Sequence, residues 1–188
     1  MSDGWTLPKA VEVGDKYWEI EADFRDILEI IEWLEHPQEP EMVRSYVSLT
    51  LFYKEFDRMP KELWNQAVEK MLWFIGGGIT DDSPAGPKLL DWKQDRFLIV
   101  ADVNRVAGCE IRALPFLHWW TFLAWFHGIG EGQLSTVVSI RDKLRRGKKL
   151  ETWEREYYQR NKSKVDLKRR YTPEEQRQQE QLKQLLGE

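Results

Sequence analysis

The sequence predicts a mostly α-helical protein: a compact multi-helix domain with a short N-terminal β-hairpin and a charged, helical C-terminal extension. Three observations support this prediction. Apolar residues recur at helical spacing through most of the chain. Proline or glycine separates one such segment from the next. Hydrophobic residues make up 41% of the chain and charged residues 32%, a balance typical of a globular protein with a buried core.

The N-terminal region predicts the hairpin and the first helix. Apolar and polar residues alternate in segments 11–13 and 16–20 around a turn that contains Gly14, which indicates two short strands. We expect this hairpin to pack on the helices, because a two-stranded ribbon is only marginally stable alone. From Asp23 the apolar residues follow one helix face, and the helix is expected to end before Pro37.

The middle of the chain predicts five further helices separated by proline or glycine. The first of them begins after Pro40, and its predicted inward face comprises Val43, Tyr46, Val47, Thr50 and Leu51. The others are expected over residues 60–75, 89–107, 114–127 and 134–144. The helix over 114–127 is apolar almost all round, which predicts that the other helices enclose it.

The character of the sequence changes after Gly147. Residues 150–167 are compatible with a helix but highly charged, and Thr172 with Glu175 has the pattern of a helix-capping box. We therefore predict two parts: a helical core domain with the N-terminal hairpin over residues 1–147, and a charged, helix-prone extension over residues 148–188.

The charge of the chain is unevenly distributed. The net charge is -4, yet residues 141–170 contain 13 basic and 5 acidic side chains, so the rest of the chain is strongly acidic. An acidic body followed by a basic segment favours self-association, an acidic partner or nucleic acid. Ten tryptophans add a large aromatic surface to be buried within the protein or against a partner.

Several classes of function are disfavoured by the composition. Cys109 is the only cysteine and the three histidines are widely spread, so neither a disulfide nor a zinc cluster is predicted. The longest apolar stretch, residues 116–126, is far shorter than the roughly 20 residues of a membrane-spanning helix. The first 16 residues lack the apolar core of a secretion signal. We expect a cytoplasmic, non-enzymatic protein with no cofactor and no metal.

His118 is the strongest candidate for a chemical role, because it lies within an apolar helical segment. A general base would need a positioned partner and a pocket. The favoured interpretation is a core histidine whose ring nitrogens are satisfied by a carboxylate or a backbone carbonyl. Asp95 is the hypothesised partner, since it lies in an apolar run where an unpaired charge would be costly.

The basic segment contains the residues we expect to bind a partner. They are Arg145, Arg146, Lys148, Lys149, Trp153, Tyr157 and Tyr158. Basic residues with interleaved aromatics are one arrangement that binds single-stranded nucleic acid. Because the chain as a whole is acidic, a protein-interaction surface is favoured over a nucleic-acid site.

Four short motifs, in this order and spacing, carry a family resemblance. The first is Asp23, Phe24 and Arg25, and the second is Asp91, Trp92, Lys93, Gln94 and Asp95, followed by Ile99, Ala101 and Gly108. The third is Leu117, His118, Trp119, Trp120, Thr121 and Phe122, followed by Gly128, and the fourth is Ile140, Arg141, Asp142 and Lys143. Over about residues 8 to 165 the chain resembles the bacteriophage gene-product-fifteen family of long-tailed phages and prophages. It departs from the family at Val103, where members tend to have phenylalanine.

The resemblance implies a role in tail morphogenesis, because the genes of the family lie among those for the tail tube and the tape measure protein. The expected function is that of a tail assembly chaperone that binds the tape measure or tail tube protein and self-associates. The expected locations are the host bacterial cytoplasm and the virion tail. A structural component retained in the tail is the alternative, and a nucleic-acid-binding protein acting through residues 141–170 is a more distant one. The resemblance implies no catalytic residue.

Overall fold

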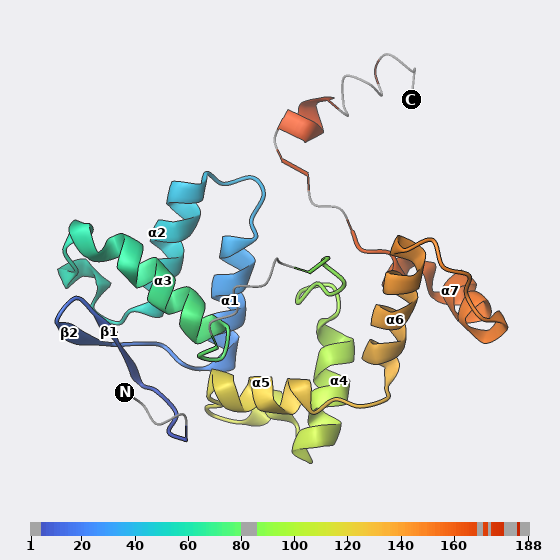
Figure 1. Cartoon of the computed structure of the whole chain (residues 1–188), viewed down its shortest axis with the longest axis horizontal. Helices are drawn as coiled ribbons and strands as arrows, with labels where there is room; N and C mark the ends of the chain where they lie inside the picture. Colours follow the sequence, from blue (N-terminus) through green and yellow to red (C-terminus); the bar gives the residue numbers. More distant parts are fainter. Residues whose placement is uncertain (1–4, 80–85, 169–170, 173, 179–183, 185–188) are drawn as a thin grey trace.

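The chain forms an N-terminal β-hairpin followed by a series of short helices (Figure 1). The computed structural model describes residues 5–79, 86–168, 171–172, 174–178 and 184. The strands are β1 (Ala10–Val13) and β2 (Lys16–Glu19). The α-helices are α1 (Phe24–Leu34), α2 (Glu41–Phe52), α3 (Trp64–Ile75), α4 (Arg96–Ala107), α5 (Trp119–His127), α6 (Gln133–Arg145) and α7 (Thr152–Val165). Three 3₁₀ turns, Phe56–Arg58, Lys61–Leu63 and Ile111–Ala113, lie between them in the described part of the chain. The predicted mostly α fold with an N-terminal hairpin is confirmed.

The hairpin packs on α3, as expected from its small size. Its strands are antiparallel, with Ala10 opposite Glu19. Val13 and Trp18 are buried, and the backbone N–H of Gly14 at the turn donates to the side chain of Gln66 on α3 over 2.9 Å. The hairpin therefore gains a hydrophobic partner that two strands alone would lack.

One continuous hydrophobic core joins the hairpin to α1, α2, α3, α4 and α5. Fully enclosed members from different elements are Ile27, Phe52, Phe74, Val103 and Trp119. Val103 is fully buried, so the family departure noted above lies at a core position. Core burial of this kind is the main favourable contribution to folding.

A second, smaller cluster holds α7 against α6. It consists of Val137, Ile140, Leu150 and Val165, with Tyr157 and Tyr158 packed around it. Leu98 of α4 packs against both clusters and so links them. In Figure 1, α6 and α7 lie at one end of the molecule and the hairpin, α2 and α3 at the other. The division at residue 147 stays a prediction.

Two predicted helices begin later than the sequence pattern indicated. The helix predicted over 89–107 begins at Arg96, because the Asp91 carboxylate accepts hydrogen bonds from the backbone N–H groups of Lys93 and Gln94 and forms a turn instead. The helix predicted over 114–127 begins at Trp119, because the residues before it are extended and bond to the segment before α1.

The predicted inward face of α2 is wrong in part: Leu51 does pack against the core, but other predicted positions do not. The buried residues of this helix are Ser48, Leu49 and Phe52, whereas Val43 and Tyr46 are exposed. The helix turns Leu49 and Phe52 toward α1 and α3. This leaves an apolar strip of α2 on the surface of the described structure.

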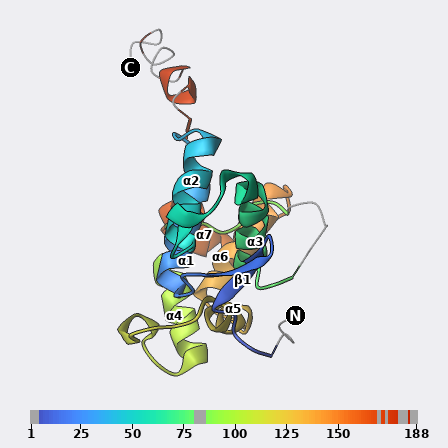
Figure 2. The same cartoon turned by 90° about the vertical axis from the view of Figure 1, so that its left-hand side faces the viewer.

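Two predictions of C-terminal secondary structure fall on described residues and are confirmed. Helix α7 spans Thr152–Val165 within the predicted segment. The hydroxyl of Thr172 accepts from the backbone N–H of Glu175 over 3.2 Å, and the Glu175 carboxylate accepts from the Thr172 N–H over 2.9 Å. This is the reciprocal pair of a capping box, and a helical turn follows over residues 174–178. Figure 2 shows that this turn lies apart from the helices of the body.

Within the described residues, no helix is both long enough and apolar enough to cross a lipid bilayer.

Gly78 provides a test of how α3 ends against α5. Its φ is +79°, and a Cβ at this position would lie 2.6 Å from Cη2 of Trp120. We expect Gly78→Ala to lower the free energy of unfolding by about 2–4 kcal/mol, because the side chain is strained in this conformation and displaces the indole. Urea denaturation followed by circular dichroism measures the loss.

Gly130→Ala is the matched control. A Cβ there meets nothing within 4 Å, and its φ lies outside the left-handed region. Its free energy of unfolding should stay near that of the unmodified chain. Equal losses for the two variants would contradict the role given to Gly78.

Candidate functional site

The residues that carry the family resemblance form two buried polar networks. The first surrounds Asp23, which caps the N-terminus of α1 by accepting from the backbone N–H of Arg25 over 3.0 Å. The Asp23 carboxylate also accepts from the Arg25 guanidinium over 2.7 and 2.9 Å, and from the backbone N–H of Leu117 over 2.9 Å. One carboxylate thus joins the start of α1 to the segment before α5.

Backbone hydrogen bonds extend this junction. The N–H of Phe24 donates to the carbonyl of Leu117 over 2.9 Å, and the N–H of Trp119 donates to the carbonyl of Ala22 over 2.7 Å. Burial alone would raise the pKa of the Asp23 carboxyl, but its hydrogen bonds from Arg25 and Leu117 outweigh burial and lower the pKa. The carboxylate is therefore held in its charged form.

His118 lies in the same network as the N-cap of α5. Its Nδ1 accepts from the backbone N–H of Trp120 over 3.1 Å, so the proton of the neutral ring is assigned to Nε2, which donates to the carbonyl of Pro8 over 3.0 Å. Both ring nitrogens are occupied by backbone groups. The prediction of a core histidine satisfied by hydrogen bonds describes this arrangement.

The hypothesised pair of His118 and Asp95 is wrong. His118 bonds to Pro8 and Trp120, whereas the Asp95 carboxylate bonds to Arg141. The sequence could not identify Pro8 as the partner of His118 or Arg141 as the partner of Asp95, because these residues lie 110 and 46 positions away along the chain. A buried carboxylate needs a cation or several donors, and Arg141 provides more than a neutral histidine would.

The two tryptophans after His118 fasten α5 to the end of α3. Nε1 of Trp119 donates to the carbonyl of Ile75 over 2.8 Å, and Nε1 of Trp120 donates to the carbonyl of Phe74 over 2.9 Å. Carbonyls in the last turn of a helix have no i+4 partner within the helix, so they are available to these indoles; the Phe74 carbonyl accepts from the backbone N–H of Gly77 as well. Their rings fill the core at the same time.

Stacked aromatic rings connect the remaining motif residues. Phe24 stacks on Phe122 with ring centroids 5.0 Å apart, and Phe122 stacks on Trp119 at 5.4 Å. Trp92 completes the group, with its ring centroid 6.0 Å from that of Trp119 and 5.0 Å from that of Phe126. These motif residues belong to the interior of the protein.

The second network surrounds Arg141, which forms a buried ion pair with Asp95. The guanidinium donates to both carboxylate oxygens, over 2.6 and 2.9 Å, and both side chains are almost fully buried. It also donates to the backbone carbonyls of Leu89, Lys164 and Val165 over 2.9, 2.9 and 2.6 Å. All five N–H donors of an arginine side chain are accounted for in this arrangement.

Gln94 supports the same junction from the turn before α4. Its amide nitrogen donates to the carbonyl of Asp166 over 2.8 Å, and its amide oxygen accepts from the backbone N–H of Lys168 over 2.9 Å. The Arg141 and Gln94 side chains together fix the segment that follows α7 against the start of α4.

The predicted partner-binding residues lie around α7 and the turn before it, but they do not share one environment. Arg145 and Arg146 both pair with Asp142 on the surface. Lys148 and Lys149 are exposed, and 57% of the Trp153 side chain is accessible. Tyr157 and Tyr158 are instead half-buried against the second core cluster, and the hydroxyl of Tyr158 donates to Asp166 over 2.9 Å. The structure brings the first five residues to the surface; their binding role stays a prediction.

Two features were missed from the sequence. Glu154 is a nearly fully buried carboxylate that accepts from Nζ of Lys143 over 2.7 Å and from the backbone N–H of Glu151 over 2.9 Å. The glutamate three residues after Glu151 is a capping pattern that could have indicated it. The second feature is a surface groove between α2 and α3, lined in part by Met42 and Tyr46. No sequence signal separated these residues from the core face.

Within the described part of the chain, no group of three or more histidine, cysteine or acidic side chains could hold a metal ion. Cys109 is exposed. The buried charged groups described above face backbone atoms or one another. Their hydrogen bonds connect helices and the segments that lead into them, and so hold these elements together.

Comparison with known proteins gives one match. A family model described as Bacteriophage Gp15 protein matches residues 5–167. Nothing among curated proteins or solved structures matches the chain. The matched region includes all four of the motifs and both of the networks described above.

Arg141→Met tests the buried ion pair. The substitution leaves the Asp95 carboxylate buried without its cation, so we expect the free energy of unfolding to fall by about 3–5 kcal/mol. Chemical denaturation measures the loss. Adding Asp95→Asn should recover part of it, because the uncompensated charge is then removed.

Arg145→Ala is the control for this experiment. Arg145 is exposed and pairs with Asp142 on the surface, so its loss should cost no more than about 1 kcal/mol. If Arg141→Met lowered the free energy of unfolding as little as this control does, the buried pair would not have the structural role assigned to it.

His118→Asn tests the pH dependence of stability. Burial lowers the pKa of the folded-state histidine, so the unfolded chain binds a proton more readily. The stability that the neutral ring contributes is complete above the unfolded-state pKa of about 6.5 and is lost as the pH falls through the folded-state pKa. Asparagine keeps an N-cap acceptor but does not titrate, so the decline in urea midpoint between about pH 7 and 5 should flatten.

The exposed His127 provides the comparison. His127→Asn should leave the decline unchanged. A decline that persists in His118→Asn and disappears in His127→Asn would show that the wrong histidine has been identified.

Proposed function

Because the chain belongs to the bacteriophage Gp15 protein family, we propose that it is a non-enzymatic tail assembly protein, a chaperone that binds the tape measure or tail tube protein. The observation that carries the proposal is the family match over residues 5–167, which spans most of the chain. The order of the four motifs supports the same assignment.

The internal use of the motif residues supports a binding role over a catalytic one. The polar atoms of Asp23, His118 and Arg141 bond to backbone groups, and the two charged side chains also bond to the ion-pair partners Arg25 and Asp95. A catalytic residue needs a polar atom directed at a substrate in a pocket. The motifs therefore provide a stable scaffold, and a function based on binding has to be located on the outer surface.

The exposed side chains supply what a binding protein needs. Trp153 is 57% accessible, and Lys148 and Lys149 lie exposed before the same helix. An exposed tryptophan at the start of a helix, with basic groups in the turn before it, can recognise a partner that offers apolar and acidic side chains, whether a tail protein or another copy of this chain. Many copies of such a protein can bind along one long helical partner. Binding sites that share one partner are close together, and this high effective concentration strengthens the overall binding.

Co-expression tests the proposal directly. We expect the chain to co-purify with the tape measure or tail tube protein of the same phage, in a complex that survives gel filtration. A chaperone leaves the particle after assembly, so mass spectrometry of purified virions should detect no peptide of this chain.

Other results would assign other roles. Stoichiometric peptides in the mature tail would replace the chaperone with a retained structural component. Salt-sensitive binding to single-stranded nucleic acid, without a complex with either tail protein, would favour the basic segment 141–170 as a nucleic-acid site. Absence of any complex and absence from the particle would reject the tail role.

A further inference from the structure

A groove between α2 and α3 exposes apolar side chains that the hydrophobic core does not bury. It encloses about 540 Å³, within the approximate range of 300–1,000 Å³ typical of binding pockets. Its lining includes the apolar Met42, Tyr46, Trp64 and Val68 and the acidic Glu41 and Glu69. Met42 is 83% exposed and Tyr46 51% exposed, so the groove presents apolar side chains to water. Such exposure marks a candidate binding surface.

The charged side chains that line this groove are all acidic. Glu41 begins α2 and Glu69 lies on the facing side of α3, and neither forms an ion pair with any described residue. No lysine or arginine is among the lining residues. The occupant that fits this surface is an apolar group flanked by basic side chains.

The turn between α6 and α7 has that composition. Residues 143–155 contain six basic and two acidic residues, and one of the two, Glu154, is already paired with Lys143. Lys148 and Lys149 are exposed and form no ion pair with described residues, and Trp153 projects from the first turn of α7. A large apolar side chain therefore stands beside uncompensated positive charge.

The turn is held rigidly in place. Leu150 is buried in the second core cluster, and the backbone N–H of Lys148 donates to the carbonyl of Lys143 over 2.8 Å. The bond between Lys143 and Glu154 joins the two helices on either side. Rigid presentation lowers the entropy lost on binding.

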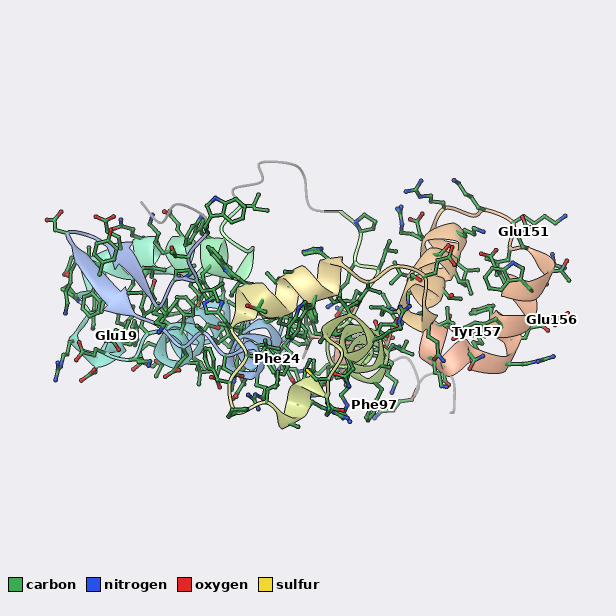
Figure 3. All side chains as sticks on the ribbon, turned by 90° about the horizontal axis from the view of Figure 1, so that it is seen from below. Glu19, Phe24, Phe97, Glu151, Glu156 and Tyr157 are labelled. Carbon is green, nitrogen blue, oxygen red and sulfur yellow. The ribbon has the colours of Figure 1, made fainter. Side chains whose placement is uncertain are left out.

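The groove and the turn lie at opposite ends of the molecule. Figure 1 shows α2 and α3 at one end of the long axis and α6 and α7 at the other. In Figure 3, viewed from below, Glu151 in the turn lies far along this axis from Glu19 of the hairpin, which packs beside α3. One copy cannot bring its own turn to its own groove without unfolding, so the complementary surface has to come from another copy.

We propose that the chain self-associates head to tail, with the α6–α7 turn of one copy docked in the α2–α3 groove of the next. Trp153 occupies the apolar groove, and Lys148 and Lys149 face Glu41 and Glu69. This contact uses two different surfaces, so it repeats from copy to copy and produces a ring or a filament. The contact does not depend on the identity of the tail partner.

Sedimentation velocity of the full chain tests this contact. At low salt the average sedimentation coefficient should rise with protein concentration, because larger assemblies form. Added salt should reverse this rise, because it screens the charges at the contact. Met42→Asp in the groove should weaken association about ten-fold or more, because a charged carboxylate would then be buried against Trp153. Lys148→Glu with Lys149→Glu in the turn should weaken it by a similar factor, because acidic groups then face the acidic groove. Phe97→Asp is the matched control: Phe97 is exposed in the first turn of α4, as Met42 is in the first turn of α2.

Two complementary experiments test which surfaces meet. A mixture of the Met42→Asp chain with the Lys148→Glu and Lys149→Glu chain should form a 1:1 heterodimer and grow no further, because one intact groove meets one intact turn. Reversing the groove with Glu41→Lys and Glu69→Lys in the chain that carries the reversed turn should restore self-association.

Specific outcomes would overturn the proposal. They are a chain that stays monomeric at every concentration, association that Phe97→Asp weakens as much as Met42→Asp, and association that survives both the groove and the turn substitutions. If Met42→Asp leaves the free chain unchanged but releases a co-purified tail protein, the groove binds that protein instead. A monomeric chain that still co-purifies with a tail protein rejects this contact and leaves the proposed function standing.

Discussion

The guanidinium of Arg141 joins three parts of the chain that are far apart in the sequence: the residues from Leu89 to Asp95 that lead into α4, helix α6 and the end of α7. A buried charge has a large desolvation cost, which is offset only when it is paired and its remaining hydrogen-bonding groups are satisfied. Asp95 and three backbone carbonyls meet that requirement here. The position of α7, and with it the charged end of the molecule, depends on this arrangement.

The Asp23 network solves a similar problem in the main core. One carboxylate caps α1 and holds the segment that leads into α5, and the next residues place the two indoles against the end of α3. Polar groups in both networks bond mostly to backbone atoms, which fixes the relative positions of elements more specifically than apolar contact does. The family motifs thus describe how the scaffold is built.

Because the two networks lie in the interior, the outer surface of the protein remains available for binding. The acidic groove and the basic turn are on elements that the two networks position at opposite ends. Segregated charge on a rigid body favours ordered association over random aggregation, because like surfaces repel and unlike surfaces attract. This property suits a protein of a phage family whose proposed task is assembly.

The sequence by itself determined the class of fold, the hairpin, the approximate positions of the helices and the family, because periodicity, proline, glycine and capping residues act over a few neighbouring positions. Only the tertiary structure decided that Asp95 pairs with Arg141 and that His118 bonds to Pro8, since those partners lie 46 and 110 residues apart. It also decided that Val43 and Tyr46 face outward, because α2 carries apolar residues on more than one face. Which face is buried depends on the neighbouring helices, and a local pattern contains no information about them.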